Sequence, residues 1–234
     1  MLLRKFFTGP PAIARVAPFL IFVLLTLAQG GCGPASAYWF YFAKTVVGLW
    51  LIYEMWPLVA EMRWAFSVEA VLVGVGVFAL WIGINGAWTT QHSLWLKLGL
   101  THAPSVPSPA WNPNDQFGSG SALAWLFIVT RILGSTFIVP PLEEVFYRSF
   151  VYRYIARVDF LSVPLNQFLP WPFLATALIF GFSHNEWLAG ILCAAAYQWL
   201  VLRKNRLGDA MTAHAITNFL LGVWVVWKGA WNFW

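Results

Sequence analysis

Residues 140–153 read PPLEEVFYRSFVYR and place two adjacent carboxylates and an arginine between long apolar runs. Ionised side chains are costly in such surroundings and are usually functional. A proline is tolerated at the first position of a helix but not in its interior, so we expect a new helix to begin at Pro141. Glu143 and Glu144 would then lie in its first turn, where the helix dipole favours anions.

Helical spacing separates the two carboxylates. Glu144 and Arg148 are four residues apart and share a helix face, whereas Glu143 points about a quarter turn away. We therefore expect Arg148 to neutralise Glu144, which leaves Glu143 available for chemistry. A plainer interpretation, a charged helix start with one ion pair, explains this segment equally well.

The composition is that of a polytopic membrane protein. Of the 234 residues, 60% are hydrophobic and only 10% are charged, with 16 Trp and 20 Phe, against a usual charged share of about 25%. The net charge of +5 does not indicate a nucleic-acid partner, because the basic residues stand at the ends of apolar runs and form no patch. Cys32 and Cys193 are far apart, so neither a disulfide framework nor a cysteine metal site is indicated.

Apolar runs of ~20 residues mark the expected membrane helices. The first, residues 16–28, is either the core of a signal peptide or an uncleaved helix, and we favour the helix because further spans follow. The other expected helices cover residues 38–56, 70–88, 121–139, 141–155, 173–184, 187–202 and 209–227. We predict the all-α fold class, a polytopic membrane helix bundle with seven or eight helices in one domain, residues 1–234.

One long loop is expected over residues 89–120, with residues 94–98 lying on the membrane surface. His92 and His102 have no partner at ligand spacing, so we interpret them as ordinary loop histidines. Arg131, in the middle of the next span, needs a partner within the bundle. Four prolines break any helix in this loop: Pro104, Pro107, Pro109 and Pro113.

Two further groups of polar residues interrupt the apolar helices after the Glu-Glu segment. One is His184, and the other is His214 with Asn218, four residues apart and therefore on one helix face. Each alone has a structural interpretation, as a histidine bonded to a neighbour or as a polar pair that joins two helices. If all three groups converge, a carboxylate, two imidazoles and a carboxamide meet in a water-poor cavity. That set is suited to water-activated peptide hydrolysis.

These groups also carry a family resemblance, which covers about residues 121–227. They resemble, in the same order, the three motifs of the intramembrane protease family that includes the CAAX prenyl endopeptidases and the bacteriocin-processing proteins. The short, Trp-rich chain is similar to the CAAX-protease-related proteins that accompany bacterial exosortase systems. The motif residues are Glu143-Glu144-x-x-x-Arg148, Phe180-x-x-x-His184 and His214-x-x-x-Asn218.

The resemblance implies an endopeptidase that cleaves a membrane-anchored, CAAX-like or sorting-tail substrate near its C-terminus. Glu143 with His184 would position and deprotonate the attacking water, and Glu144 with Arg148 would support the site. A glutamate hydrogen-bonded to a histidine can act as a base near neutral pH, so this assignment is physically reasonable.

The resemblance further implies that His214 and Asn218 stabilise the oxyanion of the tetrahedral intermediate. Asn218 can donate a hydrogen bond but cannot ionise, as an oxyanion donor should. One donor of this kind typically lowers the barrier by ~3 kcal/mol.

A divalent, zinc-like metal is an open alternative. Glu143, His184 and His214 could hold zinc with one open position. Against this, the three residues come from separate helices without a His-Glu-x-x-His pair, and Asn218 stands where a fourth ligand would be. We favour a metal-free glutamate mechanism that requires no cofactor.

Other classes fit less well. The Ser-containing loop at residues 118–121 is more simply a helix-entry linker, and Asp209 has no second aspartate for an aspartyl dyad. The main competitor is a non-catalytic membrane scaffold, an immunity protein or a small transporter that uses its charges as structural pairs or a proton path. We prefer the protease because Glu143, His184 and Asn218 are all present.

The expected partners are a membrane-anchored protein or peptide substrate and the lipid bilayer, with no nucleic acid. The expected location is a bacterial inner membrane with a cytoplasmic N-terminus, because the basic groups at residues 4–5, 153–157 and 203–206 follow the positive-inside rule.

Overall fold

The computed structural model describes residues 7–29, 32–84, 89–101 and 110–234. Every regular element among these residues is a helix, which confirms the predicted all-α fold class. The chain divides into two compact units, each built from segments that are far apart in the sequence. The first unit consists of Met1–Arg63, Pro109–Phe146 and Asn218–Trp234, and the second of Trp64–Ser108 and Tyr147–Thr217.

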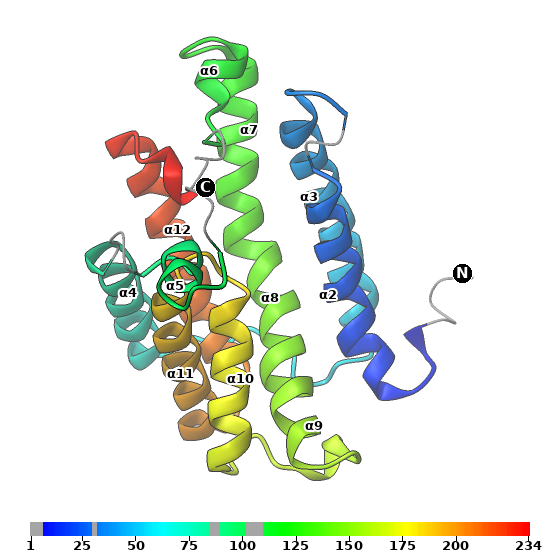
Figure 1. Ribbon diagram of the computed structural model, residues 1–234. Helices are drawn as coiled ribbons and strands as arrows, with labels where there is room; N and C mark the ends of the chain where they lie inside the picture. The colour runs from blue at the N-terminus through cyan, green and yellow to red at the C-terminus, as the bar shows by residue number, and fades with distance from the viewer. Residues whose placement is uncertain (1–6, 30–31, 85–88, 102–109) are drawn as a thin grey trace. The chain divides into compact units, whose positions relative to one another are not determined.

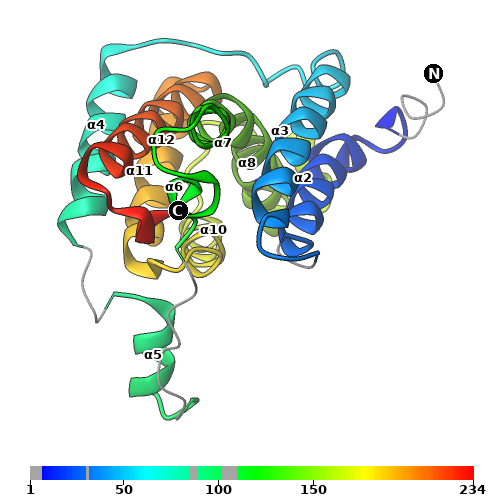
Figure 2. The same cartoon turned by 90° about the horizontal axis from the view of Figure 1, so that it is seen from above.

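The first unit contains the first part of one long helix. Its elements are α2 (Pro11–Leu27), α3 (Ser36–Met55), α6 (Pro113–Phe117), α7 (Ala122–Leu133), the π-helical η1 (Gly134–Ile138), α8 (Val139–Glu144) and η4 (Trp231–Phe233). α3 packs against α2, α7 and α8, and Figures 1 and 2 show α2 and α3 side by side. Gly48 permits this packing, because a Cβ atom there would lie 2.4 Å from Cγ2 of Ile138.

The second unit is organised around a pair of antiparallel helices. Its elements are α4 (Val68–Gly83), α5 (Gln91–Lys97), α9 (Tyr152–Ala156), η3 (Phe160–Ser162), α10 (Pro170–Phe182) and α11 (Trp187–Lys204). α10 packs along α11, which packs against α4. A Cβ atom at Gly181 would lie 2.3 Å from Cγ1 of Ile191, and one at Gly190 would lie 2.9 Å from Cα of Gly181. Small residues therefore let the two backbones touch, as is common between membrane helices.

Two helices run through both units. One is the 35-residue helix Ala122–Ala156, whose second π-helical segment, η2 (Val145–Val151), follows α8. The other is α12 (Gly208–Lys228), which belongs to the second unit up to Thr217 and to the first unit from Asn218.

The prediction that a new helix begins at Pro141 is wrong. Pro140 and Pro141 occupy the first turn of α8, in the interior of the long helix, and Glu143 and Glu144 are the last two residues of α8 rather than part of a free first turn. The π-helical η1 comes directly before the prolines. Its hydrogen bonds run from residue i to residue i+5, so the helix can widen and pass two prolines without ending. The helix-dipole argument for the two carboxylates therefore does not apply.

The segment expected as one long loop contains two short helices. α5 follows Thr90, whose side chain accepts a hydrogen bond from the backbone of Ser93. α6 starts at Pro113 after Asn112, whose side chain accepts one from the backbone two residues on. Both starts have a capping side chain of the expected type, and α6 also has a proline at its first position. Some of the residues discussed above lie outside the described residues: the basic residues 4–5, His102, Pro104, Pro107, Pro109 and the end of the third span near Trp88.

Two helix starts inferred from the sequence are confirmed. Ser121 caps α7 by accepting a hydrogen bond from the backbone of Ala124, so residues 118–121 form the expected helix-entry linker. Asp209 lies in the first turn of α12, where its buried carboxylate accepts hydrogen bonds from Arg206.

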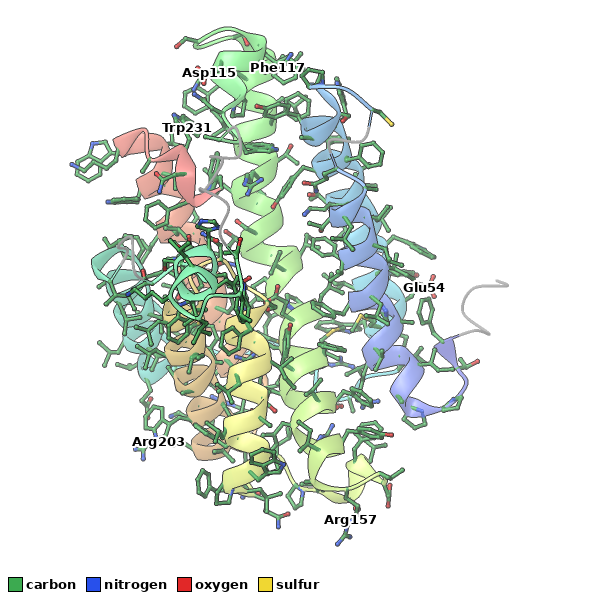
Figure 3. All side chains as sticks on the ribbon, in the orientation of Figure 1. Glu54, Asp115, Phe117, Arg157, Arg203 and Trp231 are labelled. Atoms are coloured by element: carbon green, nitrogen blue, oxygen red, sulfur yellow. The ribbon has the colours of Figure 1, made fainter. Side chains whose placement is uncertain are left out.

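The surface is that of an integral membrane protein. Ala122–Ala156 and Gly208–Lys228 are long and apolar enough to cross a membrane, and Pro11–Leu27, Val68–Gly83 and Pro170–Phe182 are shorter apolar helices. Many large apolar side chains are exposed, including Leu24, Phe66 and Trp171. In the second unit, Arg157 and Arg203 lie at the same end (Figure 3), as expected of basic residues at one membrane face.

Candidate active site

The two predicted histidines contact the same phenylalanine ring in the second unit. Phe180, near the end of α10, stacks on His184 with ring centroids 4.5 Å apart. Its ring meets that of His214 edge-on at 6.4 Å. His214 is buried in α12 and also stacks on Tyr197, at 5.2 Å. Phe180 thus brings together two of the three polar groups that the sequence singles out.

Hydrogen bonds determine the tautomer of His184. Its Nδ1 lies 2.8 Å from the carbonyl oxygen of Phe180 and 3.2 Å from Oγ of Ser183. The Ser183 hydroxyl donates to the same carbonyl at 2.7 Å. A carbonyl oxygen can only accept, so Nδ1 carries the proton. Nε2 then holds the lone pair and can act as a base or as a metal ligand.

Aromatic side chains surround this imidazole. The ring of Trp81 meets His184 edge-on at 5.7 Å, and Tyr147 packs edge-on against Phe180 at 5.0 Å. The Tyr147 hydroxyl donates to Oγ of Ser183 at 3.3 Å. These residues were not predicted from the sequence, because aromatic residues are too frequent in this chain to mark a site.

Arg148 is completely buried in the second unit. Its guanidinium carbon lies 4.5 Å from the ring centroid of Phe180 and 5.8 Å from that of Tyr197. Arg148 therefore belongs to the group of side chains around Phe180. Glu144, at the end of α8, is also completely buried, and its pairing with Arg148 stays a prediction.

Glu143 lies on α8 in the first unit. The residue is half-buried, and its Oε2 atom is buried without a hydrogen bond to any described residue. α8 is held by α2 and α3, and rings of Phe19 and Phe146 stack at 4.2 Å beside it. An oxygen without a fixed donor can accept a proton, which is what a general base requires.

Lys44, on α3, is a charged neighbour of Glu143 that the sequence analysis overlooked. Its ammonium is buried, interacts electrostatically with the Glu143 carboxylate and donates to Oγ1 of Thr26 at 3.0 Å. It also lies over the rings of Phe22 and Tyr41, at 4.9 and 4.5 Å from their centroids. A lysine inside an apolar run was a signal for such a role, because intramembrane charges usually have a named partner.

Arg131 finds its partners among aromatic rings. Its guanidinium carbon lies 4.8 Å from the ring centroid of Tyr41, 4.5 Å from Trp111 and 5.3 Å from Trp234. The Tyr41 hydroxyl also donates to the Arg131 carbonyl oxygen at 3.3 Å. The expectation that Arg131 needs a partner within the bundle is met by cation–π contacts.

Asn218 joins two helices within the first unit. Its side-chain amide donates to the carbonyl oxygen of Ser135, in η1, at 2.8 Å. This contact agrees with the structural interpretation of Asn218. The amide group has two hydrogens, so the second can still donate to a developing oxyanion.

Candidate metal ligands come from both units, with Glu143 in the first and His184 and His214 in the second. Among the residues that the structure describes, no three His, Cys, Asp or Glu side chains are grouped closely enough to hold a metal ion. The His184 Nε2 lone pair has the donor chemistry that zinc prefers. His92 lies on the short helix α5, away from these groups in the sequence.

Comparison with known families agrees with the three motifs. A family model described as type II CAAX prenyl endopeptidase Rce1-like matches residues 124–220. This region of the chain is Rce1-like. The match covers the Glu-Glu segment, His184, His214 and Asn218, and it confirms the predicted family resemblance for this region. No curated protein and no solved structure matches the chain.

Proposed function

We propose that this protein is an intramembrane endopeptidase that hydrolyses a peptide bond near the C-terminus of a membrane-anchored, CAAX-like or sorting-tail substrate. The observation that carries the proposal is the pair of histidines on the Phe180 ring in the Rce1-like region, with Nε2 of His184 free to take part in chemistry. The Rce1-like family is named for prenyl endopeptidases, which act on membrane-associated substrates.

In the proposed reaction, Glu143 and Nε2 of His184 position a water molecule, and Glu143 takes its proton. The water oxygen bonds to the substrate carbonyl carbon, whose oxygen becomes an oxyanion. The carbon–nitrogen bond then breaks, and the proton returns to the leaving amine. The products are a new carboxylate and a new amine.

The proposed oxyanion donors are His214 and the second amide hydrogen of Asn218. Glu144 and Arg148 support the site as a buried pair of opposite charges. A buried charge needs such compensation, because removing one partner leaves the other uncompensated.

The proposed reaction needs no metal. In the alternative, Glu143, His184 and His214 would hold a zinc-like ion that supplies a more acidic bound water. Loss of cleavage when a chelator is added would support the metal route, and unchanged cleavage would support the metal-free route.

The proposed location is a bacterial inner membrane with the N-terminus in the cytoplasm. The basic end of the second unit, marked by Arg157 and Arg203 in Figure 3, would then face the cytoplasm. A reporter enzyme that is active on only one side of the membrane, fused after Arg157 or after Arg203, tests this orientation.

The direct test is cleavage of a fluorogenic, membrane-anchored peptide library by the purified protein. We expect Glu143→Gln and His184→Ala to abolish cleavage at unchanged protein yield, with or without chelator. His92→Ala, which removes a histidine from α5, is the matched control and should cleave like the wild type.

A non-catalytic scaffold is the second candidate. It is favoured by Asn218, which already joins two helices through the Ser135 carbonyl. If the library is never cut and the variants only lower the melting temperature, the scaffold explains the polar residues better.

A further inference from the structure

The turn that carries His184 is held by a residue far away in the sequence. α10 ends at Phe182, and the last carbonyl groups of a helix have no partner inside it. The side-chain amide of Gln91 donates to the carbonyl oxygens of Phe182 at 2.6 Å and of His184 at 2.7 Å. The backbone N–H of Gln91 donates to the carbonyl oxygen of Asn185 at 2.8 Å. One residue thus satisfies three carbonyl groups of this turn.

A glutamine is well suited to this position. Its amide group has two hydrogens, and both bond to carbonyl oxygens, which can only accept, so the orientation of the amide is determined. A glutamate of the same shape has no donor, and an asparagine is shorter by one carbon. Without this amide the carbonyl groups of Phe182 and His184 would lose their donor, so the turn depends on the donors of Gln91.

The same turn sets the direction of the imidazole. Nδ1 of His184 is bonded to the carbonyl oxygen of Phe180 and to the hydroxyl of Ser183, so the ring follows the backbone of residues 180–184. Gln91 holds the far side of this turn. Displacing the turn would therefore rotate Nε2 away from its present direction.

Gln91 is itself held by a structured element. It is the first residue of α5, whose N-cap Thr90 accepts a hydrogen bond from the backbone of Ser93. The Ser93 hydroxyl donates back to the Thr90 carbonyl oxygen at 2.7 Å. Figure 2 shows α5 projecting from α10 and α11 of its own unit. Besides Gln91, Trp95 of α5 contacts the end of α10, where its ring stacks on Phe182 with centroids 6.3 Å apart.

We propose that Gln91 is a positioning residue that sets the direction of His184 Nε2. It acts through the backbone of residues 182–185 and does not touch the reacting atoms. Its catalytic consequence rests on the proposed function, whereas its effect on the imidazole can be measured without any activity.

The test compares Gln91→Ala and Gln91→Asn with Lys97→Ala in protein labelled with ¹⁵N-histidine. The His184 ring signals are assigned by their loss in His184→Ala. We expect both Gln91 variants to shift these signals and to leave those of His214 unchanged. In the cleavage assay they lower kcat by about 10- to 100-fold and leave KM nearly unchanged, because misplacing a catalytic group affects the transition state. Lys97→Ala, which changes an exposed residue at the other end of α5, should match the wild type in both measurements.

Failure of the positioning role can be distinguished from failure of the proposed peptidase function. Unchanged His184 signals in both Gln91 variants, at an unchanged melting temperature, would overturn the positioning role. Shifted His184 signals in a protein that cleaves no substrate would support the positioning role and count against the proposed peptidase. Should Gln91→Ala fail to fold, Gln91→Asn, which keeps the amide donors, carries the test.

Discussion

Two groups of polar side chains, one in each unit, are held in different ways. In the first unit, the cationic groups of Lys44 and Arg131 both lie over the ring of Tyr41, at 4.5 and 4.8 Å from its centroid. In the second unit, His184 and its turn are fixed by hydrogen bonds of 2.6 to 2.8 Å that include Gln91. Cation–π attraction tolerates variation in direction, whereas hydrogen bonds do not. In these two groups, the contacts in the first unit stabilise charge, and those in the second fix the orientation of His184.

This comparison predicts where substitutions act. Changes around Lys44 and Arg131 should alter stability more than catalysis, and changes around His184 should alter catalysis more than stability. Glu143 and Asn218 are the expected exceptions, because they lie in the first unit but are assigned to the reaction.

Among the variants not described above, the largest effect is expected at Asn218. Asn218→Ala removes the proposed oxyanion donor, so kcat should fall by about 10²- to 10³-fold. It also removes the hydrogen bond to Ser135, which should cost about 1 kcal/mol of stability. Steady-state kinetics and thermal unfolding in detergent separate the two effects. The control is Asn232→Ala, because Asn232 is exposed in the same unit; a loss of stability without a loss of kcat would assign Asn218 to structure alone.

Phe180 should give the next largest effect. Phe180→Leu removes the ring that both histidines contact, and we expect kcat to fall by about 10-fold or more, with a loss of about 1–2 kcal/mol of stability. Phe182→Leu, on the same helix but 40% exposed, is the matched control. Equal kinetics for the two variants would show that the shared ring has no part in the site.

Packing of α10 on α11 provides a test of stability alone. Gly181→Ala would bring a Cβ atom within 2.8 Å of the Trp187 carbonyl oxygen, and we expect a loss of about 1–3 kcal/mol in the free energy of unfolding. Gly76→Ala meets no atom within 4 Å and should change stability by less than about 0.5 kcal/mol. Thermal unfolding of both variants checks this, and similar melting temperatures would argue against close packing at Gly181.

The smallest effect is expected at Arg131. Arg131→Met keeps an apolar chain against Tyr41, Trp111 and Trp234 and removes a charge, so stability should change by less than about 1 kcal/mol. The cleavage rate should stay near that of the wild type. A tenfold loss of kcat at unchanged melting temperature would give Arg131 a role in the reaction and would break the proposed division between the units.

The sequence predicted the helical spans well because long apolar runs leave few alternatives to a helix in a membrane. α3, α11 and α12 begin and end within a few residues of the expected bounds. The start at Pro141 was mispredicted because the proline rule describes a regular α-helix. The π-helical turn before Pro140 changes the hydrogen-bond register, and no local pattern in the sequence announces it.

The site was predictable only in part. His184, His214 and Asn218 stood out because polar residues are rare in apolar helices, and Lys44 carried the same signal. Gln91 did not stand out, because its partners lie more than 90 residues away. A glutamine in a polar segment also gives no signal of its own. Phe180 was visible as part of a motif, but its contacts with both histidines follow from the tertiary packing of α10 against its neighbours.

The most direct test of the peptidase is to identify the cleaved bond by mass spectrometry after reaction in H₂¹⁸O. We predict that wild-type protein cuts a membrane-anchored peptide near its C-terminus and places one ¹⁸O atom in the new carboxylate. Glu143→Gln and His184→Ala should yield no product at an unchanged melting temperature. Cleavage at the same rate and bond by either variant, or no cleavage of any membrane-anchored peptide by the wild type, would contradict the account.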